Sequence, residues 1–190
     1  MRRLDQATAT WFSGQFRQLG DQASWLRPAG QSVLDYCDAS GTAAAFSGPA
    51  SWSLSCQRSQ VRYYAYGGAS ASRLRQLERA LTRQGWGAFT VVPATPAPAG
   101  QPASLPMLIA DFTDRPSPVP KIGLQLSWIS PAAAQALKQD IGMPVATSSR
   151  VIAWTQVTAP NLSQITSALT PQRDSVLIVT LRCTYAARPA

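Results

Sequence analysis

A strand–helix–strand pattern over residues 52–92 constrains the fold more than any other stretch of the sequence. Apolar and polar residues alternate over 52–66, which is the period of a half-buried β-strand. Gly67 and Gly68 end this strand, and Gly85 ends the helix that follows. Three leucines form one face of that helix: Leu74, Leu77 and Leu81. The unit predicts a β-sheet with a helix packed on it.

The alternation within residues 52–66 changes phase part-way along. Trp52, Leu54 and Cys56 share one phase, whereas Val61 and Tyr63 share the other. We interpret this change as a bulge or a turn near residues 57–60.

The rest of the chain alternates between strand-like and helix-like stretches. The expected strands are 107–112, 121–129, 151–157 and 175–185, and the expected helices are 4–26, 130–140 and 161–169. Residues 31–50 read as a loop. We therefore expect an α+β fold with helices packed on one face of a mainly antiparallel sheet. Two split-βαβ (ferredoxin-like) halves are a finer form of the same expectation.

Four segments follow from this pattern. They are an N-terminal amphipathic helix in 1–30, a strand–helix–strand unit in 31–92, a proline-rich linker or surface excursion in 93–106, and a second α+β half in 107–190. The N-terminal helix carries Trp and Phe beside Arg, which suits a membrane interface. The alternative is that this helix packs on the core of the domain.

The sequence contains no histidine. This excludes Ser-His-Asp and Cys-His nucleophiles, zinc sites with histidine ligands and histidine acid–base chemistry. The close carboxylate pairs are Asp35 with Asp38 and Asp111 with Asp114, and neither lies in a recognisable calcium loop. We expect a protein that is not an enzyme and needs no cofactor. A cryptic aspartate-based hydrolase is an alternative.

Three cysteines occur without any C-x-x-C pair: Cys37, Cys56 and Cys183. Cys37 and Cys56 flank a loop rich in Gly, Ala and Ser, which a disulfide would tether. Such a closure contributes about 3 kcal/mol in the chain-entropy model. The alternatives are three free buried thiols, or a bond between Cys56 and Cys183.

A disulfide favours an extracytoplasmic protein associated with the cell envelope. Export would require a leader or membrane helix, and no run of 18 apolar residues is present. A cytoplasmic location is the alternative.

Basic residues outnumber acidic ones by 17 to 9, which gives a net charge of +8. This charge favours an anionic envelope polymer or a partner protein. The candidate anion-binding residues are Arg58, Arg62, Arg75, Arg79 and Arg83. The last three lie at i, i+4 and i+8, which is one stripe along the expected helix. The composition of a high-GC genome is the competing explanation for these arginines.

The same arginines also permit a nucleic-acid-binding module. Three tyrosines closely follow Arg62 on the expected strand: Tyr63, Tyr64 and Tyr66. Aromatic side chains beside arginines on a sheet can stack bases.

One part of the chain resembles a known set of sequences. Its residues are Trp52, Leu54, Cys56, Arg58, Tyr63, Tyr64, Gly67, Leu74, Leu77, Leu81, Gly85 and Trp86. With these residues, the strand–helix–strand unit resembles uncharacterised exported or membrane-anchored actinobacterial proteins. The resemblance implies an extracytoplasmic domain behind a leader or membrane helix, and it implies no catalytic residues.

Overall fold

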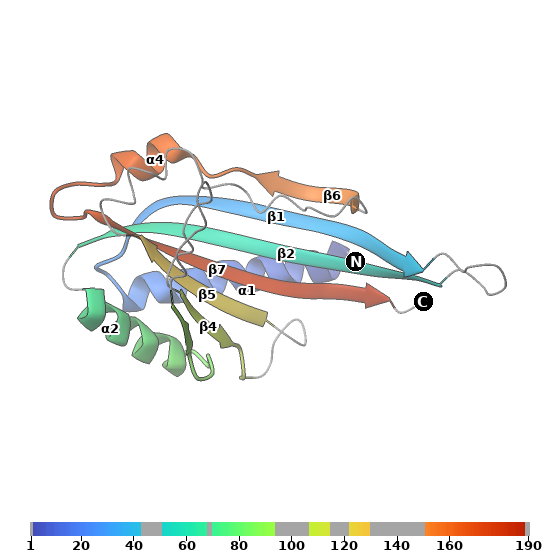
Figure 1. The fold of residues 1–190 in the computed structure, drawn as a ribbon, viewed down its shortest axis with the longest axis horizontal. Coiled ribbons are helices and arrows are strands. Elements are labelled where there is room, and N and C mark those ends of the chain that lie inside the picture. Colours follow the sequence, from blue (N-terminus) through green and yellow to red (C-terminus); the bar gives the residue numbers. More distant parts are fainter. Residues whose placement is uncertain are drawn as a thin grey trace.

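The described strands join in one antiparallel sheet. The computed structural model describes residues 2–42, 51–67, 70–93, 107–114, 122–129 and 151–188. The strands are β1 (Arg27–Thr42), β2 (Ser51–Tyr66), β3 (Thr90–Val92), β4 (Met107–Asp111), β5 (Ile122–Ile129), β6 (Val151–Thr158) and β7 (Ser175–Arg188). Their order across the seven-stranded sheet is β3-β4-β5-β7-β2-β1-β6. The long strands β7, β2 and β1 lie side by side in this order (Figure 1).

Two helices cover one face of this sheet. They are α1 (Arg2–Gln22) and α2 (Ser70–Arg83), and α1 runs behind the strands in Figure 1. The main core lies between these helices and the sheet. It includes Phe12, Phe16, Leu19, Leu77, Leu81, Trp86, Leu124, Leu126, Leu177, Val179 and Leu181. The expected α+β fold with an antiparallel sheet is therefore confirmed.

A third helix, α4 (Leu162–Ser167), packs on the opposite face. Asn161 caps it, because its side-chain oxygen accepts a hydrogen bond from the amide of Gln164 at 3.0 Å. Ile165 then contacts a smaller core that includes Val61, Tyr63 and Ala65. The sheet is thus covered by a large helical layer on one side and a small one on the other.

The phase change in β2 arises because both faces of this strand are buried. Cys56, Tyr64 and Tyr66 belong to the main core, whereas Val61 and Tyr63 belong to the core under α4. The strand continues without a turn, and its pairing with β7 shifts register between Cys56 and Gln57. The unmatched residue at this shift is Tyr185 of β7, and the pairing of β2 with β1 is regular over residues 56–60. The expectation of a bulge or a turn within β2 is therefore wrong.

The prediction of a loop over 31–50 is wrong for residues 31–42, which belong to β1. This strand pairs with β2 along its length and with β6 on its other edge. Its alternation is hidden because Val33, Asp35 and Cys37 on one face are buried, as are Ser32 and Leu34 on the other.

The suggestion of two split-βαβ halves is not borne out by the strand order. Such a half places one strand between the two parallel strands that its helix connects. Here β4, β5 and β7 separate β2 from β3, the strands on either side of α2. The strands on either side of α4, β6 and β7, are separated by β1 and β2 and run antiparallel.

Some expectations fall on residues outside the described ranges. The helix expected at 130–140 and nearly all of the proline-rich segment 93–106 are among them. The strands on either side of that segment, β3 and β4, pair with each other. The division of the chain into four segments stays a prediction.

The N-terminal helix docks on the domain core, which was one of its two expected places. Phe12, Phe16 and Leu19 are buried, and Trp11 makes edge contacts with Trp86 and Phe112. Across the described residues, no helix has the length and apolar character needed to span a membrane.

Candidate functional site

A disulfide joins Cys37 of β1 to Cys56 of β2, as predicted. The two residues are direct partners across the antiparallel strand pair, so the bond links neighbouring strands in the sheet. Cys183 is a free thiol and is buried in β7. The bond belongs to the layer between the sheet and α1, because both half-cystines lie in the main core.

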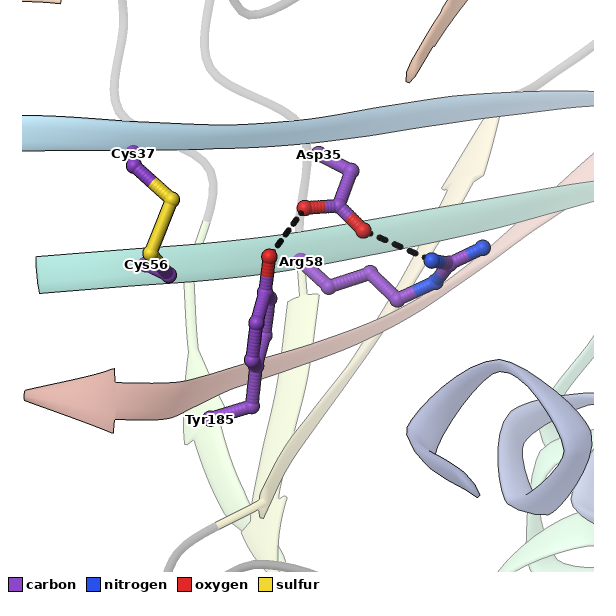
Figure 2. The surroundings of a disulfide bond; sticks show 5 residues. All are labelled: Asp35, Cys37, Cys56, Arg58 and Tyr185. Atoms are coloured by element: carbon purple, nitrogen blue, oxygen red, sulfur yellow. Dashed lines mark hydrogen bonds and ion pairs between the residues drawn. A yellow bond between two sulfur atoms is a disulfide. The ribbon is translucent and has the colours of Figure 1, made fainter. Parts of the chain in front are cut away.

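An ion pair lies beside this disulfide. The guanidinium of Arg58 donates a hydrogen bond of 2.6 Å to the Asp35 carboxylate, and both side chains are buried. The hydroxyl of Tyr185 donates a 2.8 Å bond to the other oxygen of Asp35. Figure 2 shows Tyr185 reaching from β7 to Asp35 on β1. Arg58 was a candidate for anion binding, and here its anion is a carboxylate of the same chain.

The three arginines of α2 have a different setting. Arg75, Arg79 and Arg83 are exposed, while Leu77 and Leu81 on the opposite side of the helix are buried. The Nε–H groups of Arg79 and Arg83 each donate to the backbone carbonyl four residues earlier. In the described part of the chain, none of the three lies within 4.0 Å of a carboxylate oxygen. Three uncompensated positive charges therefore share one helix face.

Arg62 lies on the inner side of the sheet against α1. Its guanidinium stacks on the Phe16 ring, with 5.5 Å between the guanidinium carbon and the ring centroid. It lines a pocket of about 330 Å³ together with residues of α1, β1 and β2: Ser13, Phe16, Arg17, Gly20, Pro28 and Tyr64. We call this space the α1–β2 pocket. No residue of α2 lines it, so Arg62 and the arginines of α2 do not share one site.

The tyrosines of β2 are buried rather than displayed. Tyr63, Tyr64 and Tyr66 are each less than 5% exposed, and their rings are not free to stack on bases. Burial raises the pKa of Tyr64 to about 12, although the nearby charge of Arg62 acts in the opposite direction. The phenol of Tyr64 therefore stays protonated at physiological pH and can donate a hydrogen bond.

A second pocket, of about 390 Å³, opens on the sheet face opposite α1. It is lined by residues of β1, β2, β5 and β7: Leu34, Tyr36, Gln57, Arg58, Ser59, Gly123, Arg182, Cys183 and Thr184. Within it the hydroxyl of Tyr36 lies 3.5 Å from the side-chain oxygen of Gln57, the limit of a hydrogen bond. Two of the lining residues are arginines, Arg58 and Arg182, and Arg58 is already paired with Asp35.

The carboxylates do not assemble into an acid–base pair in the described structure. Asp35 is held by Arg58 and Tyr185, and Asp111 and Asp114 lie on the surface. The side chain of Asp38 falls outside the described residues. Among the side chains that the structure describes, no group of three His, Cys, Asp or Glu residues could hold a metal ion.

Comparison with protein-family models, with curated proteins and with solved structures finds no match.

Two residues of these sites were not singled out in the sequence. Arg17 is exposed on α1 and reaches the pocket through the packing of α1 on β2. Its only sequence signal is that Ser13, Arg17 and Gly20 share one helical face. Tyr185 gave no signal, because its partner Asp35 is 150 residues away in the chain.

Proposed function

We propose that this chain is a non-enzymatic, extracytoplasmic binding domain that holds an anionic partner on the outer face of α2. The observation that carries the proposal is the stripe of Arg75, Arg79 and Arg83, which is exposed and lacks carboxylate partners in the described part of the chain. Like charges at i and i+4 repel one another by a few tenths of a kcal/mol per pair. A bound polyanion would remove this repulsion.

The fold supports this choice of face. Leu77, Ala80 and Leu81 anchor α2 to the main core, and Gly85 ends the helix with a positive φ of 91°. The arginines therefore stand on a helix whose orientation is set by packing. Such a surface suits an acidic partner protein or an anionic envelope polymer.

The extracytoplasmic location is the second part of the proposal. The Cys37–Cys56 bond supports it, since stable disulfides persist in oxidising compartments. The resemblance of residues 52–86 to exported actinobacterial proteins points the same way.

Chromatography on heparin, a soluble polyanion, tests the role of α2. The test variant is Arg75→Gln/Arg79→Gln/Arg83→Gln. Its matched control, Arg27→Gln/Arg173→Gln/Arg182→Gln, removes three exposed arginines from other elements and so lowers the net charge equally. We expect the α2 variant to elute at much lower salt than the wild type and the control to elute close to it. Equal losses in the two variants would assign retention to net charge alone.

A further inference from the structure

The α1–β2 pocket presents two positive charges to one partly open space. Arg62 lies on β2 and Arg17 on α1, and both line the pocket. Neither guanidinium lies within 4.0 Å of a carboxylate oxygen of another described residue. Asp21 is one helical turn beyond Arg17 and is exposed, and it forms no ion pair with Arg17. Arg58, on the same face of β2, is by contrast neutralised by Asp35.

Arg62 also has an unused hydrogen-bond donor. Its Nε–H is buried and has no partner among the described residues. A buried donor without a partner destabilises the folded protein. The stacking of the guanidinium on Phe16 holds this donor in place. Packing therefore fixes the guanidinium in the wall of the pocket.

The remaining walls suit a small organic anion. Phe16 and Tyr64 are buried and form an aromatic floor, whereas Ser13 and Pro28 lie at the exposed rim. The hydroxyl groups of Ser13 and Tyr64 add neutral donors. The volume of about 330 Å³ is at the lower end of the roughly 300–1,000 Å³ typical of small-molecule sites.

We infer that the α1–β2 pocket binds the oxyanion end of a small organic ligand, a phosphate or carboxylate group, between Arg17 and Arg62. Two guanidinium groups match such an anion with paired N–H donors. The apolar walls receive the organic part of the ligand. This site is separate from the arginine stripe on α2, and it does not depend on the function proposed for that stripe.

Gly20 offers a way to block the pocket without changing its charge. A methyl group built at this position meets no atom within 4 Å, so the space beside it is open. Gly20→Leu would extend a side chain into that region and would favour the helix, because glycine is a poor helix former. The variant should therefore fold and lack the site.

Calorimetric titration with phenyl phosphate and with benzoate tests the inference and distinguishes the two anions. We expect saturable binding of at least one probe by the wild-type protein. Arg17→Gln/Arg62→Gln should weaken it by about tenfold or more, because each lost bond involves a charged donor. Gly20→Leu should abolish it. Tighter phenyl phosphate binding assigns a phosphate ligand, and tighter benzoate binding assigns a carboxylate.

The control Arg173→Gln/Arg182→Gln removes the same charge from exposed positions outside the pocket and outside α2, and it should bind the probes as the wild type does. Full-strength binding by Gly20→Leu, or equal weakening in both arginine variants, would overturn the inference, as would the absence of binding to the wild type. Arg17→Gln alone changes an exposed side chain, so it reports on the site even if a change at Arg62 disturbs folding. Heparin retention by α2 is unaffected by these outcomes, so the two proposals fail independently.

Discussion

Asp35 illustrates how one residue can determine the role of another that is distant in the sequence. It is fully buried on β1, and its carboxylate binds Arg58 from β2 and Tyr185 from β7. A buried charge is tolerated only when it is paired and hydrogen-bonded. Asp35, Arg58 and Tyr185 therefore link the neighbouring strands β1, β2 and β7, and Arg58 stabilises the fold.

Removing the Tyr185 hydroxyl and removing Asp35 itself should destabilise the protein by different amounts. Tyr185→Phe deletes one hydrogen bond to a charged group and should cost about 1.5–3 kcal/mol. Asp35→Ala leaves Arg58 buried without its main partner and should cost about 3–5 kcal/mol. Urea unfolding measures both.

Tyr66→Phe is the matched control for Tyr185→Phe, since the Tyr66 hydroxyl bonds to no other described residue. It should cost less than about 0.5 kcal/mol. Equal costs for the two tyrosine variants would contradict the link between Asp35, Arg58 and Tyr185.

The raised pKa of Tyr64 predicts that the stability of the protein falls at alkaline pH. Its pKa is raised from 10.0 to about 12 by burial. Folding therefore favours the protonated phenol, and this stability is complete below pH 10 and is lost as the pH rises towards 12. Tyr64→Phe should lose less stability than the wild type over this range. In an absorbance titration at alkaline pH, the late tyrosine step should be smaller in the variant. A Tyr64 that ionises near pH 10 would contradict its burial.

At the scale of elements, local patterns predicted most of the strands. β5, β6 and β7 follow apolar runs in the sequence, and β4 follows a weaker one. β1 was missed because residues on both of its faces are buried and one of them is a charged aspartate. Its identity depends on its pairing with β2, which a single stretch of sequence does not contain. The α1–β2 pocket was missed for the same reason, because Arg17 and Arg62 meet only through tertiary packing.

The inner face of α2 can be tested directly. Leu77 is fully buried in the main core, so Leu77→Ala should cost about 2–5 kcal/mol. Gln76 is exposed on the same helix, and Gln76→Ala should change stability by less than about 0.5 kcal/mol. The free energies of unfolding of both variants are compared with that of the wild type. A small change at Leu77 would show that this face is not buried.

At the scale of the whole molecule, all three cysteines belong to the main core. Cys37 and Cys56 are bonded across β1 and β2, and Cys183 is buried in β7. The 19-residue separation of the bonded pair predicts a stabilisation of about 3 kcal/mol in the chain-entropy model. This bond was predicted because the two cysteines flank a loop rich in Gly, Ala and Ser, whereas its place between paired strands required the sheet.

Alkylation of the thiols checks this arrangement. The oxidised native protein should resist modification, because its one free thiol is buried. Denaturation without a reductant should expose Cys183 alone, and denaturation with a reductant should expose all three cysteines. Mass spectrometry counts the added groups. Three modified cysteines in the native protein would rule out the bond.

The most direct test of the proposed binding face is an NMR titration that resolves the arginine Nε–H signals. A heparin-derived oligosaccharide is added to isotopically labelled protein at low salt. The account predicts that the signals of Arg75, Arg79 and Arg83 shift most and return when salt is added. It also predicts small shifts for the exposed control residues Arg27, Arg173 and Arg182. Equal shifts in the two groups, or shifts confined to the control residues, would contradict the assignment of the binding surface to α2.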